Sequence, residues 1–166
     1  MGKRIISQRR GRATRRFIAP SHRFFAEAKH KTISEKSVIF GKVANLIHSV
    51  SHSAPLALIE YEDGKTGYII APEGIAVGDE IATGKVNDFK LGNTLALSDI
   101  PEGTPIYNIE SKLGDGGKYV RSSGVFARVM ARTGNKVSVL LPSKKLVLFG
   151  SKCRATIGSV AGGGRP

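Results

Sequence analysis

Cysteine and long apolar runs are scarce or missing in this sequence. The single cysteine of the 166 residues, Cys153, excludes an internal disulfide and a cysteine-based zinc cluster. No run approaches the roughly 18 apolar residues that a membrane-spanning helix requires. No apolar segment follows the basic N-terminus, as it would in a secretory signal, and the apolar residues there are too few and irregular for an organellar presequence. We therefore expect a cytoplasmic protein.

Aromatic and acidic residues are also few. Tryptophan is absent and aromatic residues make up 7% of the chain against 40% hydrophobic residues, which fits two small β-domains with aliphatic cores better than one large core. Lysine and arginine number 26 against 13 aspartate and glutamate, which gives a net charge of +13 and a pI near 10.2. A domain pI above about 9 is expected of a protein that binds a polyanion.

The charge is distributed unevenly along the chain. Residues 1–36 hold 11 basic and 2 acidic residues, a net of +9. Residues 37–102 hold 4 and 9, a net of −5, and residues 103–166 hold 11 and 2, again a net of +9. A basic arm therefore precedes a mildly acidic middle, and a second basic module follows.

The arm, residues 1–36, lacks the apolar periodicity of a helix or strand and cannot build its own core. Such a segment normally stays disordered alone and becomes ordered when phosphates replace its counterions. Arginine prevails over lysine in its most basic part, and the arginine fork suits phosphate and bases. We therefore prefer an RNA-binding arm to a tail that merely aids solubility.

Residues 37–100 predict a first small β-barrel such as an OB-fold. Short β-branched runs alternate with turn residues, and Asp63-Gly64 is a strong hairpin signal. About five strands in 65 residues suit a Greek-key barrel. The expected strands include SVIFGKVANLI, PLALIEYE, TGYIIA and DEIATG.

Residues 101–166 predict a second barrel after a proline- and glycine-containing linker at 100–105. Tight turns at 133–136 and 142–145 separate further short runs. The expected strands are PIYNIE, KYVRSS, VFARVMAR, KVSVLL, KLVLF and RATIGSV, before a glycine-rich end.

The glycine-rich stretch Gly114-Asp115-Gly116-Gly117-Lys118 resembles a phosphate-binding loop of nucleotide hydrolases but fails its pattern. Lys112 stands where the first glycine is required, and Tyr119 stands where serine or threonine must bind magnesium. We prefer a loop that brings backbone close to RNA over an ordinary wide turn, because Lys118 and Arg121 follow. For Gly162-Gly163-Gly164-Arg165, threading between RNA helices and a disordered tail remain equally open.

No residue pattern demands catalysis. His48 and His52 have helical spacing but lack a helical stripe and a third ligand, so a zinc site is disfavoured. Cys153 lies between Lys152 and Arg154 but has no paired base, which favours a small buried side chain over a nucleophile. We therefore expect neither an enzyme nor a metal site, and no cofactor apart from magnesium ions associated with RNA.

The motifs of the chain resemble a known family. They are APSHRF (19–24), SAPLALIEYEDG (53–64), APEGIAVGD (71–79), GNTL (92–95), IPEGTPIYNIE (100–110), GDGGKYVRSSG (114–124) and KCRATIG (152–158). In this order they resemble the universal large-subunit ribosomal protein of the L-two family, archaeal type. The resemblance covers nearly the whole chain.

The resemblance implies an all-β protein with a basic extension (1–36), an OB-fold (37–100) and an SH3-like barrel (101–166). It implies a structural role in the large subunit: binding its rRNA, supporting its assembly, subunit association and the peptidyl-transferase region. The implied partners are large-subunit rRNA, neighbouring ribosomal proteins and small-subunit bridge contacts, without a membrane or small-molecule substrate. A free RNA chaperone or translation factor built on the same barrels is the alternative.

Several residues are candidates for contacts with rRNA. Lys118 and Arg121 match the family's RNA-contacting loop, and Arg154 matches its CRAT element. The full set is Arg9, Arg10, Arg12, Arg15, Arg16, His22, Arg23, His52, Lys118, Arg121, Arg128, Lys152, Arg154 and Arg165.

The sequence departs from the family pattern in two places. His52 stands where the family usually has an arginine, and a neutral histidine cannot form a bidentate phosphate clamp. The family continues past GGGR with a long basic tail carrying a histidine, whereas this sequence stops at Pro166. The sequence is thus a fragment or a shortened form, and no role of that tail is carried over.

Overall fold

The computed structural model describes residues 5–10, 17–18, 24–32 and 37–164. These residues contain one short helix, α1 (Ile6–Arg10), and ten strands. The strands are β1 (Val38–Ile47), β2 (Leu56–Tyr61), β3 (Thr66–Ile70), β4 (Glu80–Gly84), β5 (Thr94–Ala96), β6 (Pro105–Tyr107), β7 (Ala127–Thr133), β8 (Lys136–Leu140), β9 (Leu146–Gly150) and β10 (Arg154–Ile157). The expected all-β class is confirmed. Within the described ranges, no helix has the length and apolar character needed to cross a membrane.

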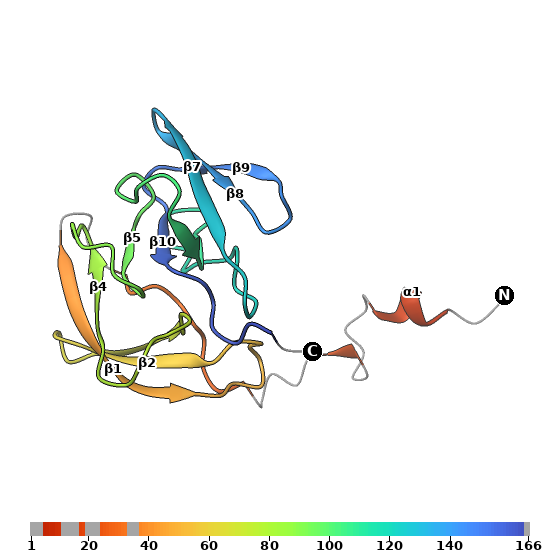
Figure 1. Cartoon of the computed structure of the whole chain (residues 1–166). Helices are drawn as coiled ribbons and strands as arrows, with labels where there is room; N and C mark the ends of the chain where they lie inside the picture. The colour runs from red at the N-terminus through yellow and green to blue at the C-terminus, as the bar shows by residue number, and fades with distance from the viewer. Residues whose placement is uncertain (1–4, 11–16, 19–23, 33–36, 165–166) are drawn as a thin grey trace.

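All ten strands join into one strongly curved sheet in the order β3-β2-β1-β4-β5-β10-β6-β7-β8-β9. Neighbouring strands are antiparallel except β4 and β5, which meet in parallel at Thr83 and Thr94. Figure 1 shows the two halves, with β1, β2 and β4 in one and β7, β8 and β9 in the other. The join between β4 and β5 therefore connects the first half of the sheet, β1 to β4, with the second half, β5 to β10.

The predicted turns form where glycine permits them. Asp63 and Gly64 close the β2–β3 hairpin, with Gly64 at a φ of 74° and the Asp63 carboxylate accepting from the backbone amide of Lys65. Gly134 closes the β7–β8 hairpin in the same way, at a φ of 57°. These local signals set the register of both hairpins.

Two segments differ from the strands that the sequence predicts. Residues 118–123, expected as a strand, contribute only one isolated bridge between Ile109 and Tyr119, because Val120 turns the chain with a φ of 56°. Thr94–Ala96 forms a strand that was not expected, because its partner is β10, about 60 residues away. This strand forms because it pairs with a segment that is distant in the sequence, and local strand propensity gives no information about such pairing.

The core is divided into three clusters. One lies in the first half, around Val43, Ile59 and Ile69. The largest lies in the second half, around Ile106, Val129, Val139 and other aliphatic side chains. Leu95, Leu97 and Ile100 belong to this second cluster, although they precede residue 101, where we expected the second barrel to begin.

The third cluster joins the halves. It brings Leu56 and Ile70 from the first half against Tyr107 and Val160 from the second. The Tyr107 hydroxyl donates to the Ile70 carbonyl at 2.9 Å. Ala28, from the N-terminal extension, is fully buried in this cluster. The end of the extension therefore takes part in the folded body.

We call residues 24–32 the strap, since they run between the two halves. The backbone amide of Lys29 donates to the Tyr68 carbonyl, and that of His30 donates to the Gly116 carbonyl. Tyr68 belongs to β3 and Gly116 to the glycine-rich loop of the second half. The expectation that all of residues 1–36 lack structure without RNA therefore does not extend to the strap.

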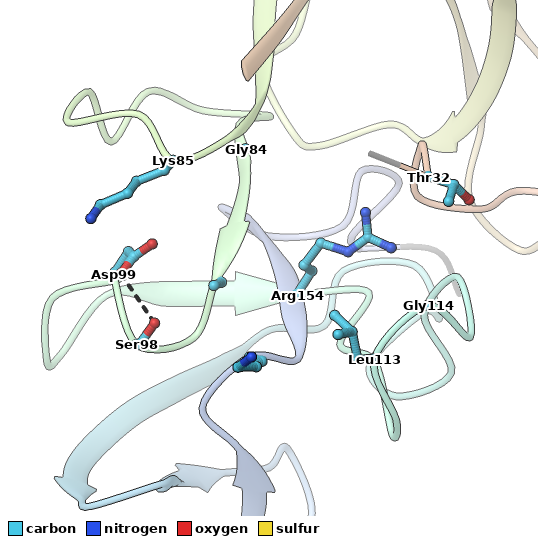
Figure 2. Close-up of a pocket in the computed structure, with 10 residues that line it drawn as sticks. Thr32, Gly84, Lys85, Ser98, Asp99, Leu113, Gly114 and Arg154 are labelled. Atoms are coloured by element: carbon cyan, nitrogen blue, oxygen red, sulfur yellow. Dashed lines mark hydrogen bonds between the residues drawn. The ribbon is translucent and has the colours of Figure 1, made fainter. Parts of the chain in front are cut away.

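A cavity of about 310 Å³ lies where the halves and the strap meet (Figure 2). Gly84 and Lys85 line it from the first half, and Thr32 from the end of the strap. Lys152 and other residues line it from the second half. We call it the seam cavity.

Candidate nucleic-acid interface

The glycine-rich loop, residues 111–118, is organised by its own aspartate. Asp115 accepts hydrogen bonds from the backbone amides of Ser111, Lys112 and Gly117 at 3.0–3.1 Å. Burial opposes ionisation of Asp115, but these bonds and the charge of Lys118 lower its pKa. The amides that a phosphate-binding loop would offer to an anion are thus occupied by the protein's own carboxylate.

Gly117 allows this loop to approach the rest of the second half. Its φ is 94°, and a Cβ atom there would lie 2.4 Å from the Asn108 side-chain oxygen. An L-residue would be strained by the backbone and would collide with Asn108. The loop backbone therefore approaches Asn108 of the protein closely. Its expected approach to RNA stays a prediction.

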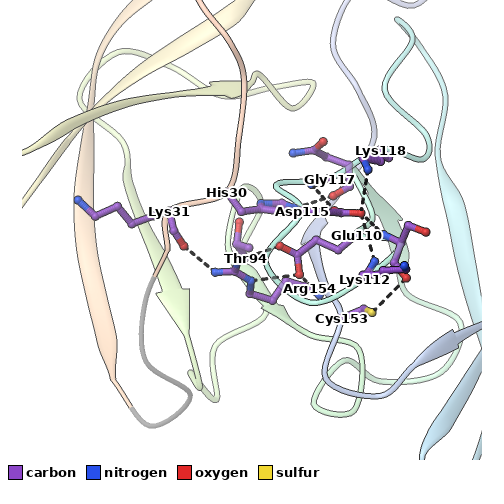
Figure 3. Close-up of polar contacts among 12 residues, drawn as sticks. His30, Lys31, Thr94, Glu110, Lys112, Asp115, Gly117, Lys118, Cys153 and Arg154 are labelled. Carbon is purple, nitrogen blue, oxygen red and sulfur yellow. Dashed lines mark hydrogen bonds and ion pairs between the residues drawn. The ribbon is translucent and has the colours of Figure 1, made fainter.

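Arg154 begins β10 and is 8% exposed. Its guanidinium donates to both carboxylate oxygens of Glu110 at 2.8 and 3.3 Å, and also to the Lys31 carbonyl of the strap at 2.6 Å (Figure 3). Burial opposes ionisation of Glu110, but the hydrogen bonds and charge of Arg154 outweigh it and lower the pKa. The arginine expected to contact rRNA is therefore engaged inside the protein.

Arg121 is half-buried and also binds inward. Its guanidinium donates to the carbonyls of Gly117 and Ala28, each at 2.9 Å. Burial lowers the pKa of this arginine. Arg121 therefore links the glycine-rich loop to the strap, a role that the sequence position did not reveal.

The strap carries further residues with specific contacts inside the protein that sequence reasoning missed. Its Lys31 pairs with Asp63 of the β2–β3 turn at 2.7 Å and lies over the Tyr61 ring at 4.5 Å. Its His30 is buried, and the ring Nε2 lies 2.6 Å from the Asn108 carbonyl. Burial lowers the pKa of His30 to about 4. The apolar Ala28 between charged neighbours was the one local sign that this segment packs.

His52 lies in a hollow between the strap and Arg121, lined also by Phe24 and Ser122. Its Nδ1 atom is 2.8 Å from the Ser51 hydroxyl and 3.1 Å from that of Ser49. Burial and the charge of Arg121 lower the pKa of His52, so near neutral pH it offers hydrogen bonds without charge.

The other basic candidates in the described part lie at the surface. Lys118 is exposed, with its ammonium 3.8 Å from Asp115. Arg128 is exposed on β7, its guanidinium carbon 5.4 Å from the centre of the Phe126 ring. Lys152 is exposed just before β10. Further exposed cations of the second half are Lys112, Arg132, Lys136, Lys144 and Lys145.

The arm candidates are only partly covered by the structure. Arg9 and Arg10 lie on α1, and the Arg10 side chain is exposed. Arg12, Arg15, Arg16, His22, Arg23 and Arg165 lie outside the described residues.

Neither a nucleophile nor a metal site emerges from the described ranges. Cys153 is buried, and burial raises the pKa of its thiol, which makes it a poor nucleophile. No cluster of three or more metal-ligating side chains is found among the residues that the structure describes.

An all-β architecture of two small halves, an excess of exposed cations on one of them and a basic extension define the class of nucleic-acid-binding β-barrel proteins. Residues 3–83 match the family model "Ribosomal Proteins L2, RNA binding N-terminal domain", and residues 90–166 match "Ribosomal Proteins L2, C-terminal domain". The chain belongs to the L2 family of ribosomal proteins. The expected order of an OB-fold and an SH3-like barrel agrees with these two domains.

Similar proteins come from archaea. The large ribosomal subunit protein uL2 of Methanococcoides burtonii is 52% identical over 165 residues, which are 99% of this chain and 70% of that protein. The uL2 proteins of Haloarcula marismortui and Methanocaldococcus jannaschii are 49% and 47% identical, over 99% of this chain and 69% of each relative. The resemblance found in the motifs is confirmed.

Proposed function

We propose that this protein is a structural constituent of the large ribosomal subunit and binds its rRNA. The observation that carries the proposal is the surplus of exposed cations on the second half. Within that half, residues 103–166 contain 11 lysines and arginines but only two acidic residues, and Glu110 is buried against Arg154 while Asp115 is bonded to its own loop. The acidic residues of this segment are therefore far too few to balance its surface lysines and arginines, which favours a polyanionic partner. The family and the names of its relatives support this.

Within this function we assign two roles to the basic residues. Lys118, Arg128 and Lys152 bind phosphates, together with the arginines of the arm and Arg165. Arg121 and Arg154 hold the strap, the glycine-rich loop and β10 in one arrangement, and His22, Arg23 and His52 add polar contacts to the RNA. A rigid frame under the exposed cations lowers the entropy lost when they bind.

The acidic half is suited to other partners. Residues 37–102 carry a net charge of −5, so we expect fewer phosphate contacts there than on the arm and residues 103–166, although residues 3–83 match a model described as RNA binding. We assign the remaining surface of this half to neighbouring ribosomal proteins, and the whole protein to subunit assembly, subunit association and support of the peptidyl-transferase region. We expected the two modules to divide near residue 100, but the packing of Leu95 in the core of the second half favours a boundary nearer residue 90.

Salt dependence tests the phosphate contacts. Affinity of the purified chain for large-subunit rRNA should fall by about 10³–10⁵-fold between 50 and 200 mM salt if roughly 6–10 phosphates are bound. Arg128→Gln and Lys152→Gln should each reduce the logarithmic salt slope by about 1. Lys65→Gln, at an exposed lysine of the acidic half, is the matched control and should leave the slope unchanged. A flat response of the unmodified protein would refute the proposal.

Sedimentation distinguishes a subunit component from a free factor. In a gradient of cell extract at high salt, the protein should move with large subunits. Protein that stays at the top would instead favour the RNA chaperone or translation factor.

A further inference from the structure

The seam cavity has the size of a site for one small ligand. Its volume of about 310 Å³ is at the lower end of the range of roughly 300–1,000 Å³ for small-molecule sites, which often lie where domains meet. Figure 2 shows Lys85 and Asp99 on the left and Arg154 and Leu113 on the right. The walls thus come from both halves of the protein.

The lining combines three kinds of chemistry. Lys85 and Lys152 supply positive charge against the carboxylate of Asp99, while the charge of Arg154 is paired with Glu110. Leu113 is an apolar wall that is 51% exposed, although it lies in a loop of charged and glycine residues. The cavity therefore suits a ligand with an anionic group, an apolar face and a polar edge.

Two of these groups have fixed positions. Arg154 is held by Glu110 and by the Lys31 carbonyl, so it forms a rigid polar wall. Asp99 accepts a hydrogen bond from the Ser98 hydroxyl at 3.0 Å, which leaves further lone pairs of the carboxylate for a donor. A carboxylate repels phosphate, so a ligand's donor group, rather than its anionic group, should face Asp99.

We propose that the seam cavity binds a single unstacked nucleotide of the bound RNA. Unpaired RNA bases are commonly extruded and held by apolar contact and edge hydrogen bonds. Lys85 and Lys152 bind the phosphate, Leu113 packs on the base, and Asp99 accepts from an exocyclic amino group. Adenine, cytosine and guanine carry such an amino group, whereas uracil offers only its ring N3–H between two carbonyl oxygens that repel a carboxylate, so the site disfavours uracil. This inference rests on the proposed RNA-binding function and adds a specific subsite to it.

Mononucleotides test the site directly on the full chain. With leucine methyl groups labelled, AMP, CMP or GMP should produce a saturable NMR shift at Leu113. UMP should bind roughly tenfold more weakly, and inorganic phosphate and adenosine more weakly still, because each provides only part of the contacts. Absence of a saturable shift with every nucleotide up to about 10 mM, or equal binding of inorganic phosphate, would overturn the inference.

Matched variants separate the cavity from the general basic surface. Leu113→Ser and Lys85→Gln should each weaken AMP binding by about tenfold, as expected for one apolar wall or one charged hydrogen bond. Leu148→Ser, at a leucine of β9 that is 60% exposed, and Lys65→Gln are the controls and should change it less than twofold. Equal loss in test and control variants would overturn the site.

Competition identifies the source of the nucleotide. In a preformed complex with large-subunit rRNA, AMP should no longer shift Leu113, because RNA already occupies the cavity. Undiminished AMP binding in that complex would overturn RNA as the source. Failure of the chain to bind rRNA at all would refute the proposed function, and a persisting AMP shift would then assign the cavity to free nucleotides.

Discussion

Replacing Arg154 by methionine tests whether this arginine serves the fold or the RNA. The change keeps much of the side-chain volume but leaves Glu110, which is 0% exposed, as a buried carboxylate without its cation. Removal of one partner of a buried ion pair costs about 3–5 kcal/mol. The backbone amide of residue 154 would still donate to Glu110, as it now does at 3.0 Å. We therefore expect Arg154→Met to lower the free energy of unfolding by an amount at the lower end of this range, about 3 kcal/mol.

A second variant separates loss of the pair from loss of side-chain packing. In Glu110→Leu/Arg154→Met both charges are gone, and replacing a buried pair by apolar groups is often neutral or stabilising. The double variant should therefore lie within about 1 kcal/mol of the unmodified protein, apart from the two lost hydrogen bonds, one to the Lys31 carbonyl and one from the backbone amide of residue 154 to Glu110. Arg128→Met, at an exposed arginine, is the control and should cost less than about 0.5 kcal/mol.

Urea unfolding followed by far-ultraviolet circular dichroism measures these differences, since the chain has no tryptophan. If Arg154→Met costs less than about 1 kcal/mol, or if the double variant is as unstable as the two single changes together, the buried pair does not stabilise the fold as argued. If stability is retained while rRNA affinity falls by tenfold or more, Arg154 contacts RNA after all.

Three further predictions concern the strap and the glycine-rich loop. Because an unfolded histidine titrates near pH 6.5 and His30 near 4 when buried, the unfolded state takes up the proton first. Stability should thus fall by about 3 kcal/mol as pH drops from 6.5 to 4. His30→Gln should lack this part of the fall in the urea midpoint, and identical pH profiles would contradict the burial argument. Gly117→Ala should lower the free energy of unfolding by at least about 2 kcal/mol, measured by thermal unfolding. Gly134→Ala, whose added Cβ meets nothing within 4 Å, is the control and should lower it by about 1 kcal/mol. Equal losses would show that the Asn108 side chain moves to accommodate the added Cβ. Arg121→Gln loses the charge and at least one of the two hydrogen bonds to the carbonyls of Gly117 and Ala28, so amide exchange of the strap should accelerate about tenfold while the salt slope of rRNA binding stays constant. Unchanged exchange with a slope reduced by about 1 would instead identify Arg121 as a phosphate contact.

Much of the fold could be read from local patterns. Short β-branched runs and turn glycines such as Gly64 and Gly134 act within a few residues, so hairpins are predictable from sequence. Thr94–Ala96 was missed because its pairing with β10 is distant. Residues 118–123 were wrongly expected as a strand because Val120 adopts a turn conformation, imposed by the loop and by the inward-facing Arg121.

The sequence predicted which segments of the candidate interface are basic, but not which of their side chains lie at the surface. The sequence alone determined the all-β class, the division of charge along the chain and the family, since these depend on residue types and their order. It could not tell that Lys152 is exposed while Arg154, two residues on, is buried. Glu110 stands 44 residues before Arg154 in the chain, and only the packing of β10 against that segment brings them together. The tertiary structure therefore decided which cations hold the protein together and which lie at its surface, because a charge is buried only where a distant partner meets it.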